Sequence, residues 1–200
     1  MLSSFARKPE TVRRAAAALL IVALANAPPS GAAARTNWAI DPARTRISFS
    51  IDAVGYPRTE GQFHHFDGRI SVDFDHPAES RVSFHVAAQS IDVGSASFSD
   101  YLRGPAFLDA GRFGEIVFSS TAVEKVDDHL VRVTGDLTML GVTRPLTVDV
   151  EVRRQAEGKR SRLEFTARAK IDRLEFGMNS GFPIISREVD LTVASEAAEQ

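Results

Sequence analysis

Alternation of apolar and polar residues dominates the chain from Trp38 onward and limits what it can fold into. Side chains on a β-strand point alternately to two faces, so a period of two predicts strands that each bury one face. The pattern recurs in about eight segments, which are residues 47–51, 68–74, 82–86, 116–118, 131–139, 146–152, 163–169 and 189–193. Turn clusters separate the segments and no long helical pattern lies between them, which predicts an antiparallel sheet.

One segment, residues 95–114, interrupts the alternation. Its Ser and Asp residues can cap helices, Pro105 suits a first helical position, and Gly104 and Gly111 can end a helix. We therefore expect two short helical turns here. Eight antiparallel strands form either a two-sheet sandwich or a closed barrel, and an eight-stranded barrel encloses either packed side chains or one small ligand. Periodicity alone leaves these alternatives open.

The N-terminal residues 1–34 differ from the rest of the chain. Four basic residues within the first 14 precede the apolar stretch 15–25, which is too short to span a bilayer comfortably. This pattern predicts a secretory signal peptide, rather than a buried N-terminal helix. Residues 28–31 would be a processing linker, and the small residues Ala32-Ala33-Ala34 that follow it favour cleavage after Ala34. We expect residues 35–200 to be one exported domain in the periplasm.

Charge and composition limit the partners. Four of the 24 basic residues and one of the 26 acidic residues lie within 1–34, so residues 35–200 hold 20 and 25, a formal charge of −5. Nucleic acid and anionic membranes require a basic patch, so neither is expected as the main partner. The apolar segments are too short for an integral membrane protein. Pairing of an edge strand would allow a homodimer, which the pattern does not require.

The chain offers little that could carry catalysis. It has no cysteine, and the adjacent His64 and His65 would point to opposite faces of a strand. No serine has a nucleophile-elbow pattern, no carboxylate pair sits in an apolar setting, and no glycine loop has a phosphate-binding ending. We therefore predict no catalytic residue, no metal site, no cofactor and no enzyme activity. If the protein did act on a lipid, Arg44, His65 and Asp172 would be the groups to inspect.

Phenylalanine is the most informative residue type. Twelve of the thirteen lie in residues 35–200, and seven fall on inward strand positions: Phe49, Phe63, Phe66, Phe74, Phe84, Phe118 and Phe165. They could fill a plain core. They could also line an elongated apolar cavity, with the insert 95–114 closing or lining one end through Phe98, Tyr101, Leu102, Phe107 and Leu108.

Motifs along the whole domain resemble those of one family. In order they are Trp38-Ala39-Ile40-Asp41 with Ile47-x-Phe49, Gly61-x-Phe63-x-x-Phe66-x-Gly68, Ser90-Ile91-Asp92-x-Gly94, Leu102 with Phe107-Leu108-Asp109, Ile116-x-Phe118-x-Ser120-Thr121, Gly135-Asp136-Leu137-Thr138-Met139 with Gly141-Val142-Thr143-Arg144-Pro145, Phe176-Gly177-Met178, and Ile185-Ser186-x-Glu188-Val189. Together they resemble the YceI-like family, which are exported, lipocalin-like bacterial proteins also described as polyisoprenoid-binding.

The resemblance implies an all-β fold, an eight-stranded antiparallel lipocalin-like barrel with a short helical insert near 95–114. It implies a periplasmic carrier, without catalysis, that holds a polyisoprenoid or similar long-chain amphiphile, such as a quinone or a fatty lipid. The ligand-binding residues expected on this basis are Phe49, Ile51, Phe63, Phe66, Phe84, Val86, Phe98, Tyr101, Leu102, Phe107, Phe118, Leu137, Met139, Leu146 and Phe165. The alternatives are a structural or interaction module with a solid core, and an enzyme acting on a lipid or quinone.

Four residues depart from the family pattern. Arg44, Phe98, Tyr101 and Leu140 stand where polar residues or histidines are frequent in the family. These replacements predict a different or more apolar ligand, with Leu140 as the position of most interest. In the surrounding stretch 135–150 we expect Leu137, Met139, Leu146 and Val148 to point inward, around a short turn bracketed by Gly141 and Pro145.

Overall fold

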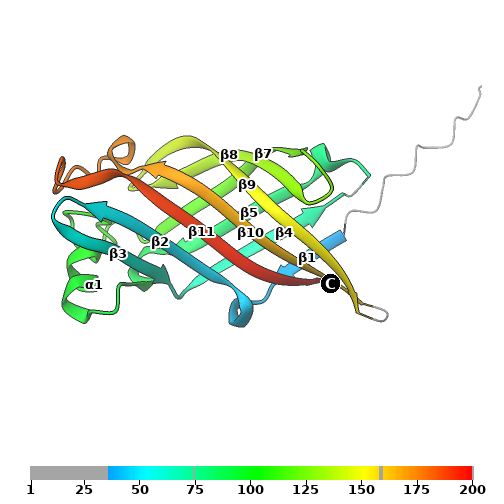
Figure 1. The fold of residues 1–200 in the computed structure, drawn as a ribbon, viewed down its shortest axis with the longest axis horizontal. Helices are drawn as coiled ribbons and strands as arrows, with labels where there is room; N and C mark the ends of the chain where they lie inside the picture. The colour runs from blue at the N-terminus through cyan, green and yellow to red at the C-terminus, as the bar shows by residue number, and fades with distance from the viewer. Residues whose placement is uncertain (1–35, 74, 158–159, 200) are drawn as a thin grey trace, which may run out of the picture. The chain divides into compact units, whose positions relative to one another are not determined.

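The computed structural model describes residues 36–73, 75–157 and 160–199 (Figure 1). The predicted signal peptide, residues 1–34, and Phe74 therefore lie outside the described residues. No helix in the described ranges is long and apolar enough to cross a membrane.

Strands make up most of the described chain. Eleven are present there: β1 (Thr36–Ile40), β2 (Arg46–Ala53), β3 (Tyr56–Phe63), β4 (Phe66–Val72), β5 (Arg81–Ala87), β6 (Ile91–Asp92), β7 (Glu115–Lys125), β8 (Leu130–Met139), β9 (Val142–Glu157), β10 (Arg160–Asp172) and β11 (Ile185–Glu199). One α-helix, α1 (Ala96–Arg103), lies between β6 and β7. Four short 3₁₀ turns complete the set: η1 (Pro42–Arg44), η2 (Pro77–Glu79), η3 (Ala88–Ser90) and η4 (Arg173–Phe176).

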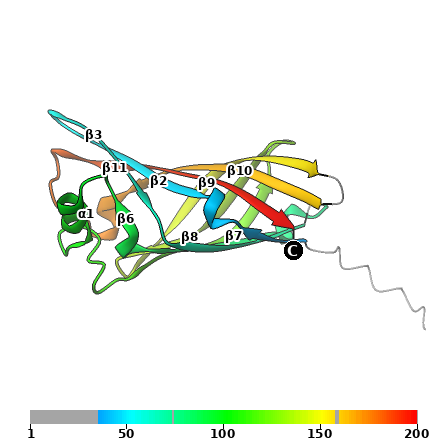
Figure 2. The ribbon, with the colours of Figure 1, turned by 90° about the horizontal axis from the view of Figure 1, so that it is seen from below.

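The strands form one antiparallel sheet that closes on itself. The order β1-β4-β5-β7-β8-β9-β10-β11 is completed by a second pairing of β1 with β11. At the other end of β11 the sheet continues through β2, β3 and β6. The predicted fold class, an antiparallel all-β barrel with a helical insert, is confirmed, and Figures 1 and 2 show its strands running obliquely along an elongated body.

The strand count exceeds the predicted eight because three strands are interrupted. The 3₁₀ turn η1 separates β1 from β2, and both of these pair with β11. His64 and His65 separate β3 from β4, while η3 separates β5 from β6. Joined across these breaks, the eleven segments correspond to eight strands around one barrel.

The insert between β6 and β7 differs from the prediction of two helical turns. Its first half is helical, as α1, but Gly104 caps that helix and the chain after it forms hydrogen-bonded turns. The amide of Asp109 donates to the carbonyl of Gly104 at 2.9 Å, and Asp109 itself has a positive φ of 42°. A left-handed residue at this point prevents a second right-handed helix. Pro105 therefore begins a turn.

The hairpin between β8 and β9 is tighter than predicted. Its turn consists of Leu140 and Gly141 alone, with φ of 55° and 73°, and Met139 pairs with Val142. Two positive φ angles define a turn whose twist matches that of the flanking strands. Pro145 lies inside β9 instead of at the edge of the turn.

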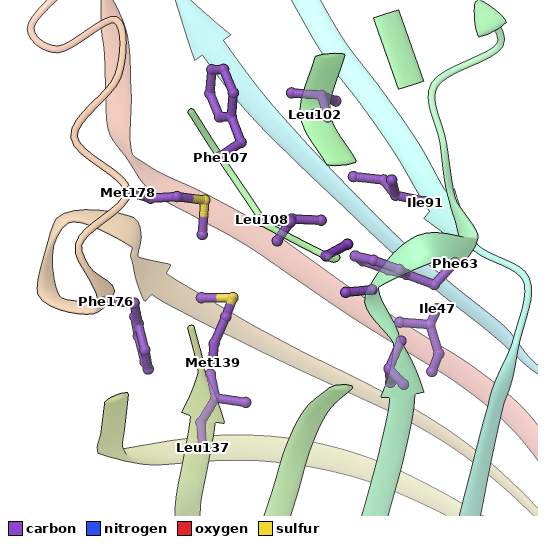
Figure 3. Packing of buried hydrophobic residues seen from close by; sticks show 13 residues of the cluster. Ile47, Phe63, Ile91, Leu102, Phe107, Leu108, Leu137, Met139, Phe176 and Met178 are labelled. Atoms are coloured by element: carbon purple, nitrogen blue, oxygen red, sulfur yellow. The ribbon is translucent and has the colours of Figure 1, made fainter. Parts of the chain in front are cut away.

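Buried side chains gather in two clusters. The larger lies at the α1 end of the barrel, where Leu102, Phe107 and Leu108 of the insert belong to one cluster with Met139 and Met178 (Figure 3). The smaller is built from Trp38, Ile40, Ile70, Leu163 and Phe165. Some inward side chains, among them Phe49, Phe84 and Phe118, are only half-buried although they lie inside the barrel.

Candidate functional site

An elongated cavity of about 1010 Å³ occupies the interior of the barrel. Its wall consists mainly of the alternate inward residues of the strands. On β9 and β10, for example, these are Leu146, Val148, Val150, Val152, Leu163, Phe165, Ala167, Ala169 and Ile171. Leu163 and Ile171 are eight steps apart on β10, which at about 3.4 Å per step and a tilt of about 40° corresponds to roughly 20 Å along the barrel. We refer to this cavity as the tunnel.

The tunnel is hollow where a packed core would be filled. Phe49, Phe84 and Phe118 point into the barrel, yet each keeps part of its surface accessible. Packed protein interiors leave few voids larger than a water molecule. An apolar cavity of this size therefore does not fit the interpretation of a solidly packed barrel.

Glycine residues beneath aromatic rings help to keep the tunnel open. Phe49 on β2 is the cross-strand partner of Gly61 on β3. A Cβ atom placed on Gly61 would lie 2.5 Å from Cζ of Phe49 and 2.8 Å from Cγ1 of Val93. The ring therefore lies against the backbone of the neighbouring strand, in space that any other residue would occupy.

Two further glycines also lie against aromatic rings. Gly68 is the cross-strand partner of Phe84, and a Cβ on it would lie 3.0 Å from Cδ1 of that ring. A Cβ on Gly135 would lie 2.6 Å from Cζ of Phe118. In all three cases the glycine lets a ring line the wall without filling the bore.

Thirteen of the fifteen residues predicted from sequence as ligand contacts line the tunnel. They are Phe49, Ile51, Phe63, Phe84, Val86, Phe98, Leu102, Phe107, Phe118, Leu137, Met139, Leu146 and Phe165. The structure thus brings them together around one space. Their contact with a ligand stays a prediction.

The other two lie elsewhere. Phe66 begins β4 directly after the break at His64 and His65, and it packs half-buried between the two core clusters. Tyr101 is exposed on α1, with its ring stacked on that of Phe98 at 6.4 Å. Leu140 also lies away from the wall, in the β8–β9 turn, where it packs against the larger cluster.

The ionisable groups suggested by sequence do not face the tunnel. Arg44 forms ion pairs on the outer surface, one of them with Glu196, and His65 is exposed. Nε of Arg187 donates to the carboxylate of Asp172 at 2.8 Å, and this bond holds the pKa of Asp172 below its ordinary value. Within the described ranges no group of three His, Asp or Glu residues could hold a metal ion.

Polar groups that the sequence did not single out stand near the two ends of the tunnel. At the end formed by η2 and the β7–β8 turn they are Asp73, Ser80, Lys125, Asp127 and Asp128. Nζ of Lys125 lies 2.7 Å from the carboxylate of Asp128. At the α1 end the polar lining groups are Arg58, Thr59, Glu60 and Arg173. Most of these residues occupy turns or strand ends, which an alternating pattern assigns to solvent.

Arg173 is the most deeply buried charged group, with 1% of its surface exposed. Its guanidinium donates to the carbonyl of Ser186 at 2.7 Å, of Ser180 at 2.9 Å and of Ile185 at 3.0 Å, and also to that of Met178. Burial lowers the pKa of Arg173. These four bonds fix the loop 177–184 at the α1 end of the tunnel.

The fold and the cavity together define a hollow antiparallel β-barrel with an apolar bore and charged ends. A family model described as the YceI-like domain matches residues 38–197. Protein YceI of Escherichia coli O157:H7 is 34% identical over 158 residues, which cover 77% of this chain and 81% of that protein. The chain therefore belongs to the YceI-like domain family, as its motifs indicated.

Solved structures show the same fold. BcnA of Burkholderia cenocepacia matches with a TM-score of 0.70 and 24% identity, over 78% of this chain and 98% of that one. A polyisoprenoid binding domain from Saccharophagus degradans matches with a TM-score of 0.63 and 11% identity, over 84% and 100% of the two chains. At these identities the likeness is one of fold.

Proposed function

We propose that the protein is a carrier that encloses a long-chain isoprenoid, quinone or similar amphiphile in the tunnel. The observation that carries the proposal is the apolar cavity of about 1010 Å³ along the barrel. Its volume is at the upper end of the range for small-molecule sites, which is about 300–1,000 Å³. Its length suits a chain better than a compact ligand.

The energetics of such a ligand need few polar contacts. Burial of one methylene is worth about 0.8 kcal/mol, so about 15 carbons contribute about 12 kcal/mol before the entropy lost on binding. The middle of the tunnel offers apolar side chains, which is what a hydrocarbon chain requires. Charged residues such as Lys125 and Arg58 stand only near its ends, where an amphiphile would place its polar part.

The same arrangement supports binding without catalysis. Catalytic acids and bases usually have pKa values tuned by burial and neighbouring groups at the reacting centre. In the described part of the tunnel wall the charged side chains lie near the ends, and Lys125 and Arg58 are held in ion pairs. The polyisoprenoid binding domain of similar fold supports an isoprenoid as the first ligand to test.

The ligand can be identified directly. Protein purified without detergent should release a long-chain lipid into organic solvent in nearly equimolar amount, as measured by mass spectrometry. Protein that is repeatedly empty, and that takes up no added polyprenol, would contradict the proposal.

A matched pair of variants tests whether the tunnel is the site. Ala167 lines the tunnel, whereas the adjacent Thr166 points to the outer face of β10. Ala167→Phe should reduce uptake of a fluorescent polyprenol at least tenfold, because the new ring fills the bore. Thr166→Phe should bind as the unmodified protein does. Equal uptake by both variants would place the ligand outside the tunnel.

The proposal includes export to the periplasm with removal of residues 1–34. The basic start and apolar stretch of this segment support it. Mass spectrometry of the protein recovered from the periplasm should give a chain beginning at Arg35. An intact N-terminus on protein retained in the cytoplasm would contradict this part of the proposal.

A further inference from the structure

Large exposed apolar side chains gather at one end of the barrel. Seven are present in the described residues, and six of them belong to the β2–β3 hairpin, α1 and the loop 177–184: Val54, Tyr56, Phe98, Tyr101, Phe182 and Ile184. All three segments lie at the same end of the molecule in both ribbon views (Figures 1 and 2). We call these six residues the rim. The seventh, Val126, lies in the β7–β8 turn at the opposite end.

The rim is continuous with the tunnel. Tyr56, Phe98 and Ile184 are exposed on the outside and also line the cavity. The amide of Val54 donates to the carbonyl of Ile184 at 2.9 Å, which joins two of the segments. A ligand leaving the tunnel at this end would therefore pass from apolar wall to apolar rim.

We propose that the rim docks on the surface of an uncharged lipid bilayer and lets the ligand pass between bilayer and tunnel without crossing water. This inference rests on the proposed function, because it names the source from which the tunnel is filled. A long hydrocarbon chain is unfavourable in water in proportion to the area it exposes. Exposed apolar patches on soluble domains mark contact surfaces, and tyrosine is enriched where proteins meet the membrane interface.

A second copy of the chain fits the rim less well. A stable protein interface buries about 800 Å² on each partner and involves about 20–30 residues a side. The rim offers six large apolar side chains on three separate segments. A second copy seated on it would also cover the tunnel end that the ligand has to use. A bilayer accommodates separate protruding side chains, because the headgroup layer deforms around each of them.

The charges beside the rim favour an uncharged lipid surface over an anionic one. Nη1 of Arg58 lies 3.2 Å from the carboxylate of Asp52, and Arg58 also pairs with Asp190. Nη1 of Arg103 lies 2.6 Å from Asp100. These cations already have anionic partners, so anionic lipid should add little attraction. Binding should therefore change little with salt, since it does not depend on charge.

Site-specific fluorescence can show which end meets the bilayer. The chain has no cysteine, so Val54→Cys and Val126→Cys each provide one labelling site, at the rim and at the opposite end. An environment-sensitive dye at position 54 should shift to the blue when phosphatidylcholine vesicles are added, and the dye at 126 should not. No shift at position 54, or an equal shift at both positions, would overturn the proposal.

A second pair of variants separates docking from ligand binding. Val54 and Phe182 belong to the rim but do not line the tunnel. Val54→Ser with Phe182→Ser should lower co-sedimentation with phosphatidylcholine vesicles at least tenfold, and Val126→Ser should not. Uptake of a polyprenol added from ethanol should be unchanged in both. If that uptake fails in the unmodified protein, the proposed function is wrong; if uptake persists and rim variants sediment normally, only the docking proposal is wrong.

Discussion

The ring of Phe49 lies against Gly61, its cross-strand partner, so closely that a methyl group on that glycine would be 2.5 Å from the ring. The width of the tunnel thus depends on the glycines beneath the aromatic rings as well as on the rings themselves. Phe84 over Gly68 and Phe118 over Gly135 extend the arrangement around the barrel.

Gly61→Ala should narrow the tunnel, because its methyl group displaces the Phe49 ring into the bore. We expect affinity for a long-chain ligand to fall about tenfold, the equivalent of about 1.4 kcal/mol, in a fluorescence titration. Gly111→Ala is the control, since a Cβ there would meet nothing within 4 Å. Unchanged affinity in Gly61→Ala would show that the position of the Phe49 ring does not determine the width of the tunnel.

Arg173→Met should destabilise the protein strongly. It leaves four backbone carbonyls without the guanidinium that they share, and each buried unsatisfied polar group costs about 1–3 kcal/mol. We expect a loss of about 3 kcal/mol or more in the free energy of unfolding, measured with urea. Arg168→Met removes an exposed ion pair with Glu151 and should cost about 0–1 kcal/mol. Similar losses in the two variants would contradict the structural role of Arg173.

The Asp172–Arg187 pair should make stability depend on acid pH. Because the folded pKa of Asp172 is lowered, first by its hydrogen bond to Arg187, the pair stabilises the protein above the unfolded pKa of about 3.9. That stabilisation is lost as the pH falls through the folded pKa. Asp172→Asn should therefore flatten the decline in unfolding free energy between about pH 5 and pH 2. An unchanged slope would mean that the pair is not formed in solution.

Leu140→Asn should leave ligand affinity unchanged. Leu140 lies in the β8–β9 turn with a φ of 55°, away from the tunnel wall, although the sequence comparison suggested it as a position that tunes ligand preference. A left-handed φ costs a residue such as leucine about 1–2 kcal/mol, and asparagine tolerates it better. We expect a small gain in stability, reduced by the packing lost. A change in affinity of more than about threefold, roughly 0.6 kcal/mol, would restore the earlier hypothesis for Leu140.

The strands could be predicted from sequence because each inward position carries an apolar residue for a physical reason. Leu146, Val148 and the other residues of the stretch 135–150 that were expected to point inward do line the tunnel. The break at His64 and His65 leaves a trace in the sequence, because Phe63 and Phe66 lie three residues apart and the alternation changes phase between them. The prediction of a second helical turn in the insert was wrong. The residue types around Pro105 do not indicate that Asp109 adopts a left-handed backbone conformation.

The hollow interior could not be read from periodicity, which is the same in a packed barrel and an empty one. Two features of the sequence do indicate a hollow interior. Small inward residues, Ala167 and Ala169, occur mid-strand on β10, and glycines such as Gly61 recur at inward positions beside phenylalanines of the neighbouring strand. The charged groups near the tunnel ends were missed because turn residues such as Asp127 are normally solvated.

The two ends of the barrel are closed in different ways. At one end β1 joins β11 by backbone pairing, whereas at the other end β6 is the last strand of the sheet, with β3 as its partner. The insert beside β6 is held largely by side chains, among them Arg103, which donates to the carbonyls of Gln89 and Ile91. That end can widen without breaking a strand ladder. For a ligand held in the tunnel as we propose, the rates of entry and exit would then be set by this end and the affinity by the tunnel wall.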